Sequence, residues 1–586
     1  MPEPAGSITL PPGRQLALTW SIPRTYGGMT GALLRRSRAF VSLAGASVDV
    51  LTFDYGRDYD AVITRETKRG TLIPGIRIVN LWDYLESLEN FDDFPTTATA
   101  PELTVPERLP RGTIHRLLTR QTETRMAADG TTELQVDHYR RDGTLLAIDL
   151  RDRKVRGTVG GRQIVLFDRE GNPVRIWRRI WQLYAAWLDH LIGDEPAIAI
   201  VDSKIVARFA RTYNRPNVTK VHVIHNSHLA TAERPFGPLR PSRAEVLTNL
   251  HDFDAVVALT HRQREDIEVL LGPTDNLVTI PNAVSMPDLT GVPDRDPSRG
   301  IMLATLDSRK RIDHAIRAVA AVGAPATLDI YGAGTQRARL ARLIAELGAA
   351  DRIHLRGFEP DARRHFQSAS FLLLTSEFEG FPLVLQEGMA AECIPIAYDI
   401  PYGPSDIIRH GVNGFLVPAG DIDAVAGCVT QLIAMPEPDR ERMRDAARST
   451  ALQFTDEAIT RRWAAELDAA VARKQVGGRR FTLVAGDCRL SKDDDGSVRV
   501  SVTLKLDPAR VTPDEVTIAL AGSQPLAELR APAELRSHWL LAGRYTATAV
   551  FSPDRIGWLG ELESLEPSAL VRSGASVRRA SAGGQS

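Results

Sequence analysis

Two glutamates, Glu379 and Glu387, are separated by seven residues in an otherwise apolar stretch of the sequence. Pro382 suits the start of a helix, because its fixed φ fits there and its missing N–H would have no partner. Glu379 would then precede that helix, near the positive end of the helix dipole, and Glu387 would lie inside it. Two carboxylates beside one crevice could hold sugar hydroxyls. On most helices, however, such a pair is only a capping residue and a surface residue.

Three consecutive cations, Arg309, Lys310 and Arg311, follow a predicted strand at 300–305. Cations at the end of a strand and beside a helix N-terminus suit a diphosphate, because opposite charges neutralise each other at close range. The plain alternative is a solvated basic turn, which is what most such runs are.

Glycine turns follow several predicted strands: Gly27 and Gly28 open a helix after the first strand, Gly332 lies in "YGAG" and Gly403 in "YGPSDII". Glycine lets a backbone approach a ligand closely, and helix N–H groups bind anions. Each turn alone is a common strand-to-helix connection. Together with the glutamates and the cations, they indicate one crevice at the carboxyl ends of parallel strands.

Three histidines lie at or near the end of another predicted strand, "KVHVIHNS". His222 is within the strand, and we interpret it as structural. His225, at the strand end, and His228, just beyond it, are the better candidates for contacting a substrate. No Asp or Cys cluster at metal-ligand spacing lies nearby, so no metal is expected.

The elements that would position these residues alternate between strands and helices in two stretches, which predicts two doubly wound domains. We expect an N-terminal domain from 1–83 and 172–274, and a second from 275–474 that ends in a helix near 455–474. Short alternating runs predict an antiparallel meander inserted at 84–171, with a hairpin around Asp142 and Gly143. A helix is expected from 174 to 193. A small β-domain is expected at 479–571, with a hairpin turn at 493–496, and a flexible tail at 572–586.

The composition is that of an ordinary globular protein, with 43% hydrophobic and 25% charged residues among 586. The net charge of −1 gives no global field that would favour nucleic acid. Three scattered cysteines and the lack of a convincing signal peptide or long apolar run predict a cytoplasmic protein without disulfides.

This constellation resembles the retaining glycosyltransferases of the GT-B fold that carry a Glu-x7-Glu motif (glycosyltransferase family 4), and the residues from Glu379 to Glu387 match that motif. The stretch "AYDIPYGPSDIIRHGVNGFLV" is similar to a bacterial branch that adds α-linked glucose or N-acetylglucosamine to wall teichoic acid or to serine-rich adhesins. That branch carries an inserted meander, which 84–171 fits. The similarity extends from about Trp20 to Lys474.

The resemblance implies an α/β protein of the GT-B fold, in which an acceptor domain and a nucleotide-sugar domain face a cleft. Glu387 would bind the ribose of a UDP-sugar, Glu379 would lie beside the transferred sugar, and Lys310 would contact the diphosphate. His225 would be the active-site histidine near the donor sugar. The phosphates would be approached by a further set of residues: Gly27, Gly28, Arg309, Gly332 and Gly403.

The family is metal-independent, so the resemblance implies a nucleotide sugar as donor and no cofactor. The implied partners are a polyol-phosphate polymer or a protein acceptor, the membrane surface peripherally, and further copies of the chain through the meander. The meander could equally be an acceptor-docking surface.

One departure separates this sequence from the family. An arginine is usual five residues before the lysine, and Thr305 stands there instead. Three functions therefore stay open: an α-glycosyltransferase for a polyol-phosphate polymer, an O-glycosyltransferase for serine-rich proteins, and a catalytically silent subunit that binds a partner. Intact Glu379, Glu387 and Lys310 argue against the silent subunit.

Overall fold

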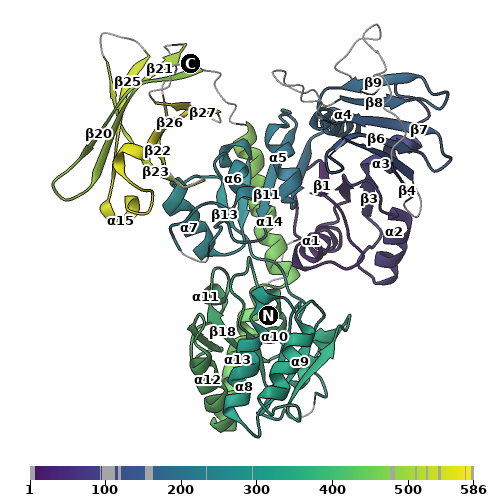
Figure 1. Cartoon of the computed structure of the whole chain (residues 1–586), viewed down its shortest axis with the longest axis vertical. Helices are drawn as coiled ribbons and strands as arrows, with labels where there is room; N and C mark the ends of the chain where they lie inside the picture. The colour runs from purple at the N-terminus through teal and green to yellow at the C-terminus, as the bar shows by residue number, and fades with distance from the viewer. Residues whose placement is uncertain are drawn as a thin grey trace. The chain divides into compact units, whose positions relative to one another are not determined.

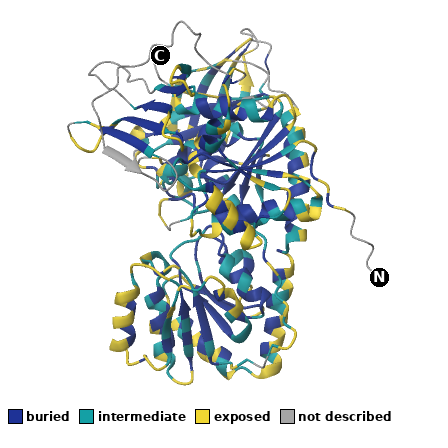
Figure 2. Ribbon diagram, turned by 90° about the vertical axis from the view of Figure 1, so that its right-hand side faces the viewer, coloured by how far each residue is buried: buried dark blue, intermediate teal, exposed yellow. Residues whose placement is uncertain are grey.

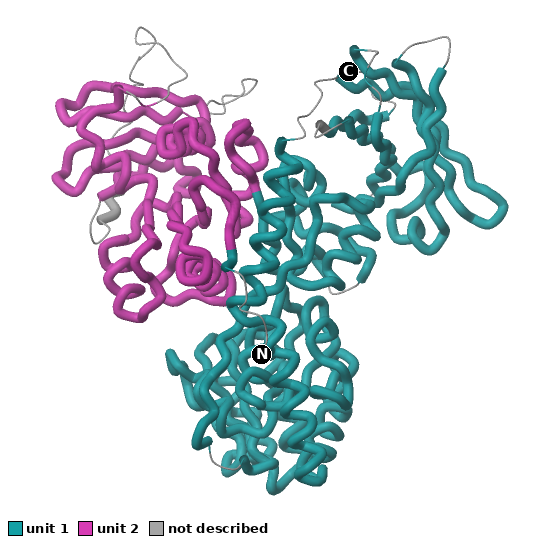
Figure 3. Tube along the Cα trace, turned by 180° about the vertical axis from the view of Figure 1, so that it is seen from behind, with its two compact units in different colours: residues 1–8, 221–586 teal, residues 9–220 magenta. Residues whose placement is uncertain are grey.

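The computed structural model describes residues 7–582, apart from 93, 95–112, 117–120, 128, 152–162, 232–233, 293–294, 476–481, 509–510, 512, 523–525, 539–542 and 574–575. The chain forms two compact units, one of Thr9–Lys220 and one of Met1–Ile8 with Val221–Ser586 (Figure 3). This division is coarser than the predicted domains, whose boundaries stay a prediction.

The smaller unit contains parallel strands in the order β10-β1-β2-β3. These strands are β1 (Arg14–Thr19), β2 (Val48–Thr52), β3 (Ile76–Asn80) and β10 (Ala197–Val201). The helices of this unit are α1 (Gly28–Ala44), α2 (Tyr59–Lys68), α3 (Leu81–Ser87), α4 (Ile180–Ile192) and α5 (Lys204–Thr212). Burial of whole strands such as Ala197–Val201 explains their continuous apolar runs.

An antiparallel sheet of six strands, each paired with the next along the chain, follows α3 and precedes α4 in the sequence (Figure 1). The strands are β4 (Thr113–Arg116), β5 (Gln121–Met126), β6 (Glu133–Tyr139), β7 (Leu145–Leu150), β8 (Gln163–Phe167) and β9 (Pro173–Trp177). The pairing of β6 with β7 confirms the hairpin around Asp142 and Gly143. The predicted helix at 174–193 was wrong at its start, because Val174–Trp177 pairs with β8 as part of β9 and α4 begins only at Ile180.

The larger unit begins with three parallel strands that continue the strand–helix alternation. β11 (Val218–Ile224) runs into this unit from the other, followed by α6 (Pro241–Leu247), the short η2 (Leu250–Asp252), β12 (Ala255–Ala258), α7 (His261–Leu271) and β13 (Leu277–Thr279).

A second parallel sheet follows in the same unit, in the order β16-β15-β14-β17-β18-β19. Its strands are β14 (Arg299–Leu303), β15 (Thr327–Tyr331), β16 (Ile353–Gly357), β17 (Phe371–Leu374), β18 (Ile394–Asp399) and β19 (Phe415–Pro418). The strand order reverses between β14 and β17, and ligands bind at the carboxyl ends of strands at such a switch point. Buried strands lie between helices with exposed outer faces (Figure 2).

The helical elements around this sheet are η3 (Ser308–Lys310), α8 (Ile312–Val322), α9 (Arg337–Glu346), η4 (Ala362–Ser368), α10 (Leu383–Ala390), α11 (Pro404–Ile407), α12 (Ile422–Ala434) and α13 (Glu437–Leu452). α14 (Asp456–Gln475) follows them, and Arg473 near its end donates to the Asp254 carbonyl, next to β12. α14 agrees with the helix predicted near 455–474. Across the part of the chain that the structure describes, every helix is too short or too polar to cross a membrane.

The last part of the larger unit is a pair of four-stranded antiparallel sheets, ordered β20-β21-β25-β24 and β23-β22-β26-β27. The strands are β20 (Thr482–Lys492), β21 (Val498–Asp507), β22 (Glu515–Ala521), β23 (Glu528–Pro532), β24 (Glu534–Ser537), β25 (Arg544–Phe551), β26 (Glu566–Ser573) and β27 (Ser576–Ser581). The core of this β-sandwich includes Val500, Ile518 and Phe551. Part of the predicted flexible tail is in fact β27, because its backbone pairs with β26.

Candidate active site

Glu379 lies in the loop between β17 and α10, and its carboxylate is shared by two donors. The Ser376 hydroxyl donates to Glu379 Oε1 at 2.7 Å, and Lys310 Nζ donates to the same oxygen. Only 12% of the Glu379 side chain and 16% of the Lys310 side chain are exposed. The structure therefore brings together two of the three predicted catalytic residues in a largely buried ion pair.

The backbone of Lys310 is held to the end of β17. Thr375 Oγ1 donates to the carbonyl oxygen of Lys310 at 3.1 Å and to that of Arg311 at 2.9 Å. The Asp307 carboxylate also accepts from the Lys310 N–H, at 3.3 Å. These bonds fix the loop after β14 against the strand that leads to Glu379. A sequence scan for titratable residues did not identify Thr375 or Ser376.

The loop after β18 completes the support of Glu379. The Glu379 N–H donates to the Pro401 carbonyl at 2.8 Å, and the Tyr402 N–H donates to the Glu379 carbonyl at 2.9 Å. Gly403 follows with a φ of +111°, and a Cβ there would lie 2.2 Å from Pro382 Cδ. Gly403 thus allows the loop to pack against the start of α10, whose N-cap is Pro382 rather than the predicted first helical residue.

His225 reaches this site through the backbone next to Glu379. A Cβ at Gly380 would lie 2.1 Å from the His225 carbonyl oxygen and 2.7 Å from Asn226 Cα, so the two backbones are in contact. Gln263 Nε2 donates to the Asn226 carbonyl at 3.0 Å and holds the end of β11 in place. The third predicted catalytic residue is therefore adjacent to the Glu379 loop.

His228, the alternative to His225, is fully buried and cannot contact a substrate. Its ring stacks on Tyr402, with centroids 5.6 Å apart and planes inclined by 16°. Burial, helped by the positive charges of Arg234 and Arg243, lowers the His228 pKa to about 3. His222 is also buried, and its ring contacts Phe253, which agrees with a structural role.

Glu387 lies on α10 away from the packed face of that helix. Its neighbours Gln386 and Gly388 are buried, whereas 22% of the Glu387 side chain is exposed. Arg363 Nη1 donates to Glu387 Oε1 at 3.1 Å. The apolar run around Glu387 thus belongs to the core, and the carboxylate itself faces a cation at the surface of the helix.

The remaining predicted residues lie in loops at strand ends. Gly332 has a φ of +151°, and a Cβ there would lie 1.8 Å from the Ala304 carbonyl oxygen, so only glycine fits beside the segment that carries Thr305. Gly27 is the N-cap of α1 in the smaller unit, Gly28 is the first residue of that helix, and the space around Gly27 is open. Contact of these glycines with phosphate stays a prediction.

Arg309 faces an aromatic ring that sequence reasoning did not connect with it. Arg309 Cζ lies 5.5 Å from the centroid of Phe378, and Arg240 Cζ lies 4.9 Å from the same centroid. Phe378 could have been noticed as the neighbour of Glu379. Nothing in the sequence links it to Arg240, which is more than 130 positions away.

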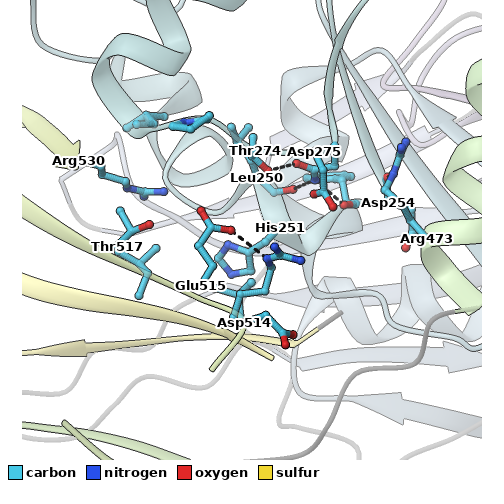
Figure 4. A pocket seen from close by; sticks show the side chains of 17 residues that line it. Leu250, His251, Asp254, Thr274, Asp275, Arg473, Asp514, Glu515, Thr517 and Arg530 are labelled. Atoms are coloured by element: carbon cyan, nitrogen blue, oxygen red, sulfur yellow. Dashed lines mark hydrogen bonds and ion pairs between the residues drawn. The ribbon is translucent and has the colours of Figure 1, made fainter. Parts of the chain in front are cut away.

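A separate pocket of about 290 Å³ lies between the β-sandwich and the segment around β12 and α7 (Figure 4). Its charged lining is largely paired: Arg572 Nε donates to Glu515 at 3.0 Å, and Arg473 Nε donates to the Asp254 carbonyl at 2.7 Å. None of the predicted site residues lines it. Within the described residues, no group of three His, Cys, Asp or Glu side chains could hold a metal ion.

Comparison with known family models gives a match to the glycosyl transferases group 1 over residues 293–450. Residues 293–450 are a group 1 glycosyltransferase domain. This domain contains the Lys310–Glu379 pair, Glu387 and the loops around them, so the protein is an enzyme of the glycosyltransferase class.

Two curated relatives extend the similarity beyond this domain. The chain is 22% identical over 513 residues to the poly(glycerol-phosphate) alpha-glucosyltransferase of Bacillus subtilis, which covers 77% of this chain and 74% of the relative. It is 24% identical over 482 residues to the poly(ribitol-phosphate) alpha-N-acetylglucosaminyltransferase of Staphylococcus aureus, which covers 75% of this chain and 96% of the relative.

Solved structures show that the group 1 domain is part of a GT-B fold, which confirms the predicted fold class. TarM from S. aureus matches with a TM-score of 0.60 and 20% identity, over 78% of this chain and 99% of TarM. The pneumococcal O-GlcNAc transferase GtfA, in complex with UDP and GlcNAc, matches with a TM-score of 0.55 and 20% identity, over 78% of this chain and 99% of GtfA.

Proposed function

We propose that the protein is a retaining α-glycosyltransferase that moves glucose or N-acetylglucosamine from a UDP-sugar to a polyol-phosphate polymer of the teichoic-acid kind. The observation that carries this proposal is the buried Lys310–Glu379 pair, held next to the backbone of His225. The two relatives that cover three quarters of the chain support the acceptor class, because their names describe transfer to poly(glycerol-phosphate) and poly(ribitol-phosphate).

Lys310 acts on the leaving group in this proposal. The bond between the sugar C1 and the diphosphate oxygen breaks, and negative charge develops on UDP. A preorganised ammonium group stabilises that charge in the transition state. Since Lys310 is paired with Glu379 in this structure, the incoming diphosphate shares the ammonium group with a carboxylate that is already in place.

Glu379 holds hydroxyls of the transferred sugar. His225, whose backbone is in contact with Gly380 beside Glu379, lies near the same sugar. The acceptor hydroxyl attacks C1 from the face that the diphosphate leaves, and its proton passes to a donor phosphate oxygen. No metal or cofactor takes part. Water must be kept out of the site, because it would compete with the acceptor for C1.

Glu387 binds the ribose hydroxyls of UDP. Because its carboxylate accepts a hydrogen bond from Arg363 in this structure, the ribose must replace or share that bond. Gly27, Gly28, Arg309, Gly332 and Gly403 are proposed to approach the phosphates, as the resemblance implies. We expect the enzyme to work in the cytoplasm, at the membrane surface, and as an oligomer through the β4–β9 sheet.

A protein acceptor is the second candidate. The likeness to GtfA, whose structure was solved with UDP and GlcNAc, supports it, although a likeness of 20% identity extends only to the fold. A silent subunit is the third, and Thr305 in place of the family arginine is the feature in its favour.

Calorimetric titration without added metal tests the proposal, with UDP, UDP-glucose and UDP-N-acetylglucosamine as ligands and Glu387→Ala as the control variant. We expect one UDP-sugar to bind to the wild type and to bind more weakly to the variant. Transfer is then assayed with poly(glycerol phosphate), poly(ribitol phosphate) and a serine-rich peptide. Transfer only to the peptide would support the second candidate, and a lack of UDP-sugar binding would support the silent subunit.

A further inference from the structure

Arg240 and Arg309 hold two guanidinium groups against one aromatic ring beside the proposed catalytic pair. Their Cζ atoms lie 4.9 and 5.5 Å from the centroid of Phe378, so they are at most 10.4 Å apart, the sum of the two distances. Phe378 is bonded directly to Glu379 in the chain. Two cations therefore converge on the loop that carries the catalytic carboxylate.

Arg240 is fixed in place by its backbone and by one side-chain nitrogen. Its N–H donates to the His228 carbonyl at 2.8 Å, and its Nε donates to the Leu229 carbonyl at 3.2 Å. Among the described residues, no carboxylate pairs with Arg240. Burial lowers its pKa, and the charge of Arg309 lowers it further.

A third guanidinium strengthens the same positive field. Arg243, one turn further along α6, is half-buried. Its pKa is lowered to about 10 by desolvation and by the neighbouring charge of Arg240. The acidic side chains of the adjoining loops are already engaged: Asp307 lies 3.8 Å from Arg309, and Glu377 lies 3.9 Å from Arg311. An anionic ligand would compensate the positive charge that these ion pairs do not neutralise.

Two anions enter the site of the proposed enzyme, the donor diphosphate and the acceptor phosphodiester backbone, and the ring of Phe378 distinguishes between them. The diphosphate itself has no carbon atoms, and the two sugars that flank it in a UDP-sugar are already assigned to Glu379 and Glu387. A polyol-phosphate chain alternates phosphates with short carbon segments, so it can pair with guanidinium groups and cover the ring between them.

The position of Arg240 in the chain favours the same anion. Arg240 follows β11 and precedes α6, in the part predicted to belong to the acceptor domain, whereas Lys310 and Glu387 belong to the group 1 domain. We propose that Arg240 and Phe378, together with Arg309 where it borders the donor phosphates, form a subsite for the phosphodiester backbone of the acceptor polymer. This inference rests on the proposed function, because it names how that same site takes its acceptor.

The test compares the wild type with Arg240→Gln and with Arg264→Gln, which removes a surface arginine paired along α7 with Glu268 at 3.3 Å. Initial rates are measured with poly(glycerol phosphate) and with glycerol, an acceptor without phosphate. Arg240→Gln should raise the KM for the polymer on the order of tenfold, the loss of one charge-assisted contact. The KM for glycerol, the KM for the donor and all constants of Arg264→Gln should stay at their wild-type values.

Salt dependence gives an independent readout. Added salt should raise the wild-type KM for the polymer, since ions screen exposed phosphate contacts, and should raise it less in Arg240→Gln. Phe378→Leu, which keeps both arginines and removes the aromatic face, should raise the same KM.

Three results would overturn the inference. An unchanged KM for the polymer in Arg240→Gln would remove the arginine from the subsite, and a raised donor KM would assign it to the diphosphate instead. A lack of any transfer by the wild type, with UDP-sugar binding absent as well, would overturn the proposed function together with this inference. Melting temperatures of all variants exclude a loss of folding as the cause.

Discussion

The site around Glu379 and the pocket beside the β-sandwich are both rich in arginine, but they treat its charge differently. In the pocket, Arg572 is paired with Glu515, and Arg530 is paired with Glu528 and also donates to the Thr248 carbonyl. At the Glu379 site, Arg240 has no carboxylate partner among the described residues. Paired charges are typical of an interface within a folded chain, whereas a cation without a carboxylate partner indicates a binding site for an anionic ligand.

Among the substitutions considered, loss of the Glu379 carboxylate should lower the transfer rate most, and it tests most directly whether the Glu379 site is the active site. Glu379→Gln keeps the shape of the side chain but leaves Lys310 without its counter-charge and the sugar without a charged acceptor. We expect kcat to fall by about 10²-fold or more, while UDP affinity changes little. Steady-state kinetics and calorimetry measure the two. Turnover close to that of the wild type would exclude Glu379 from the active site.

Substitutions in the pocket beside the β-sandwich should lower the stability of the protein and leave the transfer rate unchanged. Arg530→Met removes a buried cation and leaves Glu528 with Arg579, which lies 2.8 Å away, as its remaining partner. We expect the free energy of unfolding to fall by about 2 kcal/mol, with kcat unchanged at temperatures where the protein is folded. Denaturant unfolding and transfer assays measure this. A loss of transfer without a loss of stability would show that the pocket takes part in the reaction and is not only structural.

Glu387 should control donor affinity. Glu387→Ala removes the proposed ribose acceptor, and we expect the dissociation constant for the UDP-sugar to rise roughly tenfold, with kcat at saturation nearly unchanged. Arg363→Ala is the matched control, because it removes the partner of Glu387 and leaves the carboxylate. Calorimetry on both variants separates the roles. Weakening of similar size in both would mean that the ion pair, and not the carboxylate, matters.

The smallest effect is expected at position 305. Thr305 is exposed, so an arginine fits there and would add a cation beside the Gly332 turn. We expect Thr305→Arg to tighten UDP binding by about threefold, the yield of one solvent-exposed charge contact. If the affinity does not change, Arg309 or Arg311 already supplies that charge to the donor diphosphate. The assignment of Arg309 to the acceptor would then need revision.

The sequence predicted those parts of the site that depend on local order. The helix that carries Glu387, just after the loop of Glu379, and the strand ends that precede Lys310 and carry His225 follow from periodicity and turn residues over short windows. The apolar strands of both parallel sheets could be recognised for the same reason, because burial on both faces leaves long hydrophobic runs.

Other features depend on contacts between distant segments, which no local pattern encodes. The apolar residues of Val174–Trp177 continue the helical spacing of the residues that follow them. The segment is nevertheless a strand, because its backbone is hydrogen-bonded to β8. In the same way, β27 exists because β26 offers it a pairing edge. The approach of Arg240 to Phe378 depends on where the end of β11 meets the loop after β17, and it could not be predicted from either stretch alone.

The contact at Gly380 limits how the sequence of this enzyme can diverge. Because any side chain there would come within 2.1 Å of the His225 carbonyl oxygen, a lineage descended from this chain cannot replace Gly380 without moving β11 or the loop of Glu379. Phe378, Arg240 and Arg309 are only half-buried, so substitutions there require less rearrangement. If these three residues bind the acceptor as proposed, acceptor preference can change by single substitutions, while Gly380 keeps the end of β11 against the Glu379 loop.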